Sequence, residues 1–429
     1  MADNTNIYDF ANQAGEFDIE HFELLLAQGE GIDVKQQIDS IRIYEDIYAP
    51  FITGTVIFRD TLDIPSVIGR GGKDLLDISL KTKGLKDEKI NRISGLFYLY
   101  KFSEREMVGH KMQKYAFHFV SIEMMFDFKR TVSRAFRGSP EEIIEKIVKK
   151  YYPETEKELN FDSSSNQIKF ISNFWSPSQC INYASKTAVS SSGDASYTFF
   201  ENREGFNFKT LDTMFNIDKD KPFQIFKEND FSTNIVTEGP LAGVTERDPN
   251  KDVQIVQNVR VDTVYDFIDV YSIYGLKSRM TSYDLLKKTI STKTVSARDG
   301  SRINDHPLFS KELIDSVDPL SMYIPKHYDV TDTGNVTNSK FVQSRLSDMR
   351  IINSSKIEID VFGRTDYTVG KVIYYASNKK TSLNVQDDPD NVIDKLYSGY
   401  YLITAISHSF TRKQHLCTIE LSKEGSMVK

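Results

Sequence analysis

The N-terminal part of the chain alternates apolar and polar residues with the two-residue period of β-strands. The pattern is clear at 34–45, where Ile41 and Ile43 fall on one face, and at 51–58, where Val56 and Phe58 do so. Similar segments lie at 74–80, 93–102 and 115–122. Five or six antiparallel strands within about a hundred residues predict a small barrel or sandwich.

The pattern then changes to the helical period. Residues 124–136 favour a helix that follows the last strand. Ser139-Pro140 is a strong helix start, with an N-cap serine, proline at the first helical position and two acids after it. A second helix is predicted from Ser176-Pro177, followed by short strands at 197–200 and 205–208. Residues 137–250 are therefore interpreted as an α/β module.

Strands return in the second half of the chain. Val259 to Val270 predict one long strand that reaches Tyr274, and 278–295 predict an arm. Residues 298–336 are polar and interrupted by prolines, with one short helix near 311–316, and a helix is expected at 339–349. Strands are predicted at 356–362, 371–375, 400–410 and 415–421, with a polar loop at 378–396.

Charge and cysteine content narrow the classes of function. The 429 residues include 54 Lys and Arg against 61 Asp and Glu, a net charge of -7, which is unlike a protein that grips nucleic acid. Cys180 and Cys417 are too few and too far apart for a disulfide framework, which indicates folding in a reducing cytoplasm. No apolar run approaches the ~20 residues that cross a bilayer, so no membrane insertion is expected.

Motifs for catalysis or ligand binding are weak. The glycine-rich segment 69–74 lacks the spacing of a phosphate loop, 387–391 lacks the glycine of a calcium loop, and 190–193 is not a nucleophile elbow. His408 and His415 flank a predicted hairpin turn and are interpreted as structural histidines of its surface. We therefore predict no catalytic, metal or cofactor-binding residues, no cofactor and no enzyme activity.

The C-terminal strands form a distinctive series. A glycine turn at Gly370 leads into a strand, and Gly399 opens the segment YLITAISHSF, which is followed by TIEL at 418–421. This order resembles the last barrel of the central baseplate hub proteins of contractile-tailed bacteriophages and of the hub part of type VI secretion spikes. The resemblance assigns a structural, barrel-closing hairpin to Gly370, Gly399, Tyr401, Ile403, His408 and Phe410.

Two further segments are similar to these hubs. They are the FxxGTVxFxD pattern that begins at Phe51 and the stretch at 265–288, which resembles the hairpin that opens their second barrel. The implied fold is α+β but mainly β, with two tube-like antiparallel barrels, an α/β module between them and a helical insertion in the second barrel. The expected divisions are an N-terminal arm at 1–17, a first barrel at 18–136, the module at 137–250, a discontinuous second barrel at 251–297 and 350–429, and the insertion at 298–349.

The resemblance implies a mechanism based on shape. A homotrimer with two barrels per chain forms a ring of pseudo-sixfold symmetry, which joins a sixfold tail tube to a threefold central spike. The expected partners are the spike protein, the tail tube or tube-initiator protein, the tape-measure protein and baseplate wedge proteins, with DNA only in transit. The expected location is the virion, in the phage tail baseplate, after assembly in the host cytoplasm.

Three alternatives stay open at this point. One is a tail-associated enzyme that degrades cell walls. Another is a carbohydrate-binding or receptor-binding module, suggested by 28 Phe and 22 Tyr. The third is a spike-like secretion protein, but the chain contains no β-helix repeat, so we expect its spike to be a separate protein.

Overall fold

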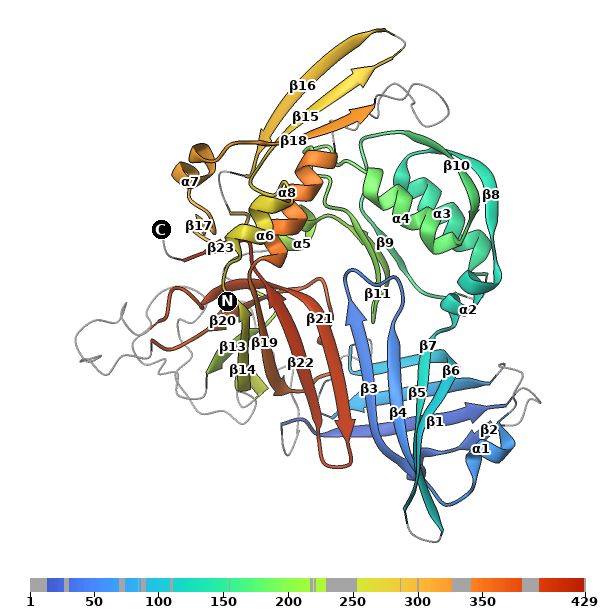
Figure 1. Ribbon diagram of the computed structural model, residues 1–429. Coiled ribbons are helices and arrows are strands. Elements are labelled where there is room, and N and C mark those ends of the chain that lie inside the picture. The colour runs from blue at the N-terminus through green and yellow to red at the C-terminus, as the bar shows by residue number, and fades with distance from the viewer. Residues whose placement is uncertain are drawn as a thin grey trace, which may run out of the picture.

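A computed structural model describes residues 14–26, 31–68, 74–83, 85, 90–108, 111–153, 155–216, 219, 221–228, 253–285, 287–298, 301–325, 341–379 and 393–427. Figure 1 shows two β regions side by side, with a helical module above the first of them. A further region, which contains a long hairpin, lies at the end of the molecule away from the first β region. Most of the predicted arm, the glycine-rich segment at 69–72, and 387–391 lie outside the described residues.

The first β region is an antiparallel sheet with the strand order β2-β1-β5-β6-β7-β4-β3. The strands alternate buried and exposed residues, so that one face forms a core with Val56 and Phe58 at its centre. Its elements are β1 (Phe17–Leu25), β2 (Gly31–Asp33), η1 (Lys35–Gln37), β3 (Ile38–Asp46), β4 (Thr53–Asp60), α1 (Ile64–Val67), β5 (Leu75–Thr82), β6 (Arg92–Val108) and β7 (Met112–Ser121).

The second β region is a closed six-stranded barrel. The pairings run β21-β20-β13-β14-β19-β22 and return from β22 to β21. These strands are β13 (Ile225–Glu228), β14 (Ile255–Thr263), β19 (Lys356–Phe362), β20 (Val372–Ala376), β21 (Gly399–Thr411) and β22 (His415–Ser422).

The barrel is not purely antiparallel, which corrects the prediction. Strand β13 is parallel to both β14 and β20. A parallel neighbour requires a connection of about a dozen residues or more, and the chain between Glu228 and Ile255 is long enough to supply it. Local alternation of residues does not reveal such a pairing.

The α/β module packs two helices against short strands. Its elements are α2 (Ile122–Lys129), β8 (Val132–Gly138), α3 (Pro140–Tyr151), β9 (Leu159–Phe161), β10 (Ile168–Trp175), α4 (Pro177–Thr187), β11 (Thr198–Asn202), β12 (Gly205–Lys209) and α5 (Leu211–Phe215). The helix predicted at 124–136 ends at Lys129, because the chain then forms β8, which pairs with β10. Helix α4 has a full capping box between Ser176 and Gln179. Ser139 precedes α3 as predicted, but its hydroxyl makes no capping bond within the described part of the chain.

The hairpin region contains α6 (Phe267–Ser272), β15 (Lys277–Asp284), β16 (Thr289–Ser296), β17 (His306–Pro307), α7 (Lys311–Ser316), β18 (Leu320–Pro325), α8 (Val342–Asn353) and β23 (Gly425–Ser426). The predicted long strand is wrong beyond Thr263, since Phe267 and Val270 belong to α6. The Asp266 carboxylate accepts a hydrogen bond from the backbone of Asp269 at 2.8 Å and caps this helix. In the described ranges, no helix is both long and apolar enough to span a membrane.

Candidate assembly site at the junction of the two β regions

Strand β21 belongs to both β regions. At its beginning it pairs with β20, with Leu402 opposite Val372, and towards its end it pairs with β3, with Phe410 opposite Ile41. Its other edge pairs with β22, with a register shift after Ile403 (Figure 1). One continuous strand therefore joins the closed barrel to the first sheet.

The hairpin residues singled out in the sequence fill two cores. Tyr401 is 1% exposed, and its hydroxyl donates a hydrogen bond to the backbone oxygen of Tyr397 at 2.5 Å. Ile403 is fully buried in the core of the closed barrel. Phe410 lies instead in the core of the first sheet, with its ring centroid 5.1 Å from that of Phe17. The hairpin thus ties the two cores together.

Of the two predicted glycines, Gly370 lies in the turn before β20 and Gly399 is the first residue of β21. Gly370 has a φ of +81°, and a Cβ atom there would lie 3.1 Å from the ring of Phe200. Its amide donates to the backbone oxygen of Ile403 at 2.9 Å. Gly399 opens β21 with a φ of +139°. The backbone at both positions therefore favours glycine.

His408 is part of a buried cluster. His408 and His415 are both fully buried, so their interpretation as surface histidines of a hairpin is wrong. His408 Nδ1 lies 3.1 Å from His415 Nε2, and Cys417 Sγ lies 3.2 Å and 3.4 Å from these two nitrogens, respectively. Burial lowers the pKa of His408 to about 3 and raises the pKa of Cys417, so the protein interior disfavours charge on these side chains.

Glu45 on β3 is a second buried polar group at the junction. Its carboxylate accepts hydrogen bonds from the Thr368 hydroxyl at 2.6 Å and from the Val369 amide at 3.3 Å. Burial raises the pKa of Glu45 to about 7, against the opposing effect of these hydrogen bonds and of Arg203. The sequence offered no signal for it, because a glutamate in an alternating strand is normally exposed.

A buried ion cluster joins the first sheet to the α/β module. The ammonium group of Lys157 lies 2.6 Å from Glu123 and 2.7 Å from Glu201. Glu201 also accepts hydrogen bonds from the Ile52 amide at 3.1 Å and the Ser121 hydroxyl at 2.8 Å. Burial alone would lower the pKa of Lys157, but the two carboxylates raise it above its usual value.

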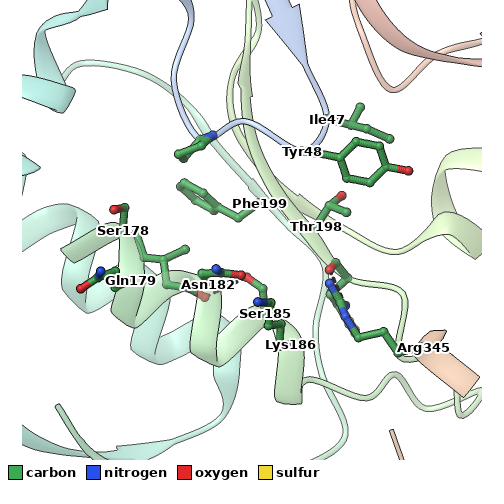
Figure 2. A pocket seen from close by; sticks show the side chains of 13 residues that line it. Ile47, Tyr48, Ser178, Gln179, Asn182, Ser185, Lys186, Thr198, Phe199 and Arg345 are labelled. Atoms are coloured by element: carbon green, nitrogen blue, oxygen red, sulfur yellow. Dashed lines mark hydrogen bonds between the residues drawn. The ribbon is translucent and has the colours of Figure 1, made fainter. Parts of the chain in front are cut away.

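A pocket of about 300 Å³ lies between the loop after β3, helix α4, strand β11 and helix α8. Figure 2 shows Ser178 and Gln179 at one end and Arg345 at the other. Arg345 donates to the backbone oxygens of Ala195 and Tyr197 at 2.9 Å and 2.7 Å, so its guanidinium is already engaged. The described residues that line the pocket include no Asp, Glu, His or Cys, and its titratable side chains are those of Lys186, Arg345 and two tyrosines.

The serine motif at 190–193 forms a structural turn in the fold. Ser190 and Ser192 hydrogen-bond to each other at 2.7 Å in a turn before Asp194. The Asp194 carboxylate accepts bonds from the backbone amides of Ser196 and Asp212. This arrangement stabilises a turn and a helix start, and it contains no histidine.

Comparisons with solved structures identify the class of fold. A 43 kDa tail protein of prophage MuSo2 from Shewanella oneidensis matches with a TM-score of 0.55 at 10% identity, over 94% of this chain and 98% of that one. A tail protein from Neisseria meningitidis MC58 matches with a TM-score of 0.53 at 7% identity, over 94% and 96%. This chain therefore has a phage tail protein fold along almost its whole length, as the resemblance of the C-terminal strands predicted.

A weaker match concerns the type VI secretion system, the second group that the C-terminal strands resemble. An E. coli component of the type VI secretion system has a TM-score of 0.44 at 9% identity, over 96% of this chain and 80% of that one. No family model and no curated protein matches the sequence.

Proposed function

We propose that this chain is a non-enzymatic hub of a contractile phage tail baseplate, and that it assembles as a homotrimer. The observation that supports this most directly is the sharing of β21 between the closed barrel and the first sheet. We infer that the two β regions act as equivalent units, so that three chains supply six of them and a threefold ring can contact a sixfold tube. The phage tail fold along the chain agrees with this role.

The proposed trimer contact includes the outer part of β6. Tyr100, Phe102, Met107 and Val108 are large apolar residues that are exposed along this strand. An exposed group of apolar side chains on an extended hairpin is typical of a surface that another subunit covers. We assign it to the neighbouring protomer, while the spike and the tail tube contact opposite faces of the ring.

The ring would also line the channel for tape-measure protein and DNA. A net charge of -7 agrees with a channel that DNA passes without electrostatic capture. The structural role is preferred over a cell-wall-degrading enzyme because the fold over almost the whole chain is that of phage tail proteins.

Mass measurement tests the proposal. Light scattering on the full chain alone should give three times the 49.2 kDa protomer mass. After addition of the spike and tube proteins from the same phage, the mass should be that of a complex with three copies of this chain. Electron microscopy of that species should show a ring with an open centre. A chain that stays monomeric with both partners, or that clears peptidoglycan in a zymogram, would refute the hub.

A further inference from the structure

The cluster of His408, His415 and Cys417 is the feature that the hub function does not use. Three atoms with lone pairs, one from each residue, converge with separations of 3.1, 3.2 and 3.4 Å. All three side chains are completely buried. Among the described residues, this is the group of histidine, cysteine and acidic side chains whose geometry suits a metal ion.

The local sequence places these donors on one face. His415 and Cys417 are two positions apart on β22, so their side chains point to the same side of the strand. His408 lies directly opposite Cys417 in the β21–β22 pairing. The hairpin therefore brings the three groups together through regular strand geometry, with no need for a special loop.

The surrounding residues fix the His415 ring. Phe410 stacks on it with a centroid separation of 3.9 Å and an interplanar angle of 17°. A Cβ atom at position 363 would lie 2.3 Å from the imidazole, so only glycine leaves room for the ring at that position. The backbone amide of His415 donates to Gly15 at 2.8 Å, and its carbonyl accepts from Gly363 at 2.8 Å. Such support is typical of residues that hold a metal ligand in place.

Hydrogen bonding alone does not satisfy this cluster. His415 Nδ1 is buried and has no hydrogen-bond partner within the described part of the chain. A neutral imidazole has one donor and one acceptor nitrogen, so one of these functions stays unused at His415 whichever tautomer is present. A cation bound to His415 Nε2 and His408 Nδ1 would engage all three convergent lone pairs at once, and the outer nitrogens, His415 Nδ1 and His408 Nε2, would carry the ring protons.

The distances suit a transition-metal cation. The nearest point equidistant from the three atoms lies about 1.9 Å from each, and a point about 1 Å out of their plane lies about 2.1 Å from each. This range suits zinc–nitrogen bonds of ~2.0–2.1 Å, and a small displacement away from the sulfur suits a zinc–sulfur bond of ~2.3 Å. Two imidazoles and a thiolate favour zinc-like cations, whereas calcium and magnesium require oxygen ligands, which this trio lacks. A divalent cation would displace the thiol proton and offset the charge of the thiolate.

We propose that His408 Nδ1, His415 Nε2 and Cys417 Sγ bind one zinc-type divalent cation, which fastens the hairpin where the closed barrel meets the first sheet. The role is structural, because the site has no access to solvent for a substrate. The proposal is independent of trimer formation, which the mass measurement reports separately.

Metal analysis of the full chain tests this site. The chain, produced in medium supplemented with zinc and dialysed, should carry close to one zinc per protomer. The variants H408A, H415A and C417S should each carry at least tenfold less zinc. The matched control is C180S, which removes the other buried, free cysteine and should keep the zinc of the wild-type chain.

A spectroscopic measurement on the wild-type chain covers the case in which a variant fails to fold. Chain produced in zinc-depleted medium with Co²⁺ should show thiolate-to-cobalt charge transfer, and this band should also appear in C180S. The zinc-bound chain should melt at a higher temperature than the metal-depleted chain. A wild-type chain that binds neither Zn²⁺ nor Co²⁺, or a folded C417S variant with undiminished zinc, would overturn the assignment.

Discussion

The hydroxyl of Thr368 donates a 2.6 Å hydrogen bond to the carboxylate of Glu45 at a point that solvent does not reach. Thr368 precedes the Gly370 turn of the closed barrel, and Glu45 lies on β3 of the first sheet. The bond therefore crosses the junction between the two β regions. Burial of the Glu45 carboxyl group at this point disfavours its charge, and the hydrogen bond from Thr368 only partly offsets that effect.

Glu45 should make the stability of the protein depend on pH. Its pKa is about 7 in the fold against 4.5 for an ordinary glutamate. Between these values the folded state binds more protons than the unfolded state, so stability is full below about pH 4.5 and falls as pH rises through 7. The loss is on the order of 3 kcal/mol, from 1.36 kcal/mol per pKa unit.

The variant E45Q tests this dependence by thermal unfolding at several pH values. Its melting temperature should be close to that of the wild-type chain at pH 5 and higher by a few degrees at pH 8. The control E358Q changes an acid on β19 that forms a 2.9 Å surface ion pair with Arg260 and should leave the pH profile unchanged. Parallel profiles for E45Q and the wild-type chain would contradict the prediction.

Removal of Lys157 should strongly destabilise the contact between the α/β module and the first sheet. The variant K157M leaves the buried carboxylates of Glu123 and Glu201 without their cation. Loss of one partner from a buried ion cluster typically costs about 3–5 kcal/mol. Thermal or chemical unfolding measures this loss, and K157M/E201Q should recover part of it.

The control for this variant is K149M. Lys149 forms an ion pair with Glu145 on the exposed face of α3. Exposed pairs of this kind contribute about 0.3–0.5 kcal/mol, so K149M should be nearly neutral. Equal effects of K157M and K149M would show that the buried cluster contributes little to stability.

Gly370 should not tolerate a side chain. The variant G370A combines a left-handed backbone, which costs about 1–2 kcal/mol, with a 3.1 Å approach to Phe200. G193A is a matched control, because Gly193 has a similar φ of +88° but no atom within 4 Å of the position that its new methyl group would take. G370A should therefore lower the melting temperature more than G193A does, and an equal shift would exclude a packing contribution.

The exposed apolar surface of β6 should determine assembly. In the double variant Y100D/M107D, the charges would be buried at the proposed protomer contact, which is unfavourable. We expect the mass from light scattering to fall from trimer to monomer, while circular dichroism stays unchanged. L62D, which alters another exposed apolar residue, should remain trimeric. A trimeric Y100D/M107D chain would place the contact elsewhere.

Local patterns predicted individual elements well, and non-local pairings poorly. Strand β19 and helix α7 lie at the positions expected, because alternation and a serine N-cap specify them within a few residues. The parallel placement of β13 depends on contacts with distant strands, and no local pattern encodes it. The α6 helix was missed because Val and Phe favour strands, whereas the Asp266 cap and the packing of Val270 outweigh that preference.

For the candidate sites, too, local features were predictable from the sequence and non-local contacts were not. The hairpin residues were identified from the sequence, and a signal for the buried cluster was also present, since His415 and Cys417 share a strand face and His408 faces them across the turn. What the sequence concealed was their burial. Gly15, Phe17 and Gly363 cover the hairpin, and they come from segments far from it in the chain.

The shared strand β21 has a consequence for dividing this protein into fragments. A recombinant piece that ends before the closed barrel would lose the partner of β3 and expose an unpaired strand edge, which promotes aggregation. A piece that begins after the first sheet would lose the cover over Phe410. We therefore expect limited proteolysis to release no stable half, and the two β regions to melt in a single transition.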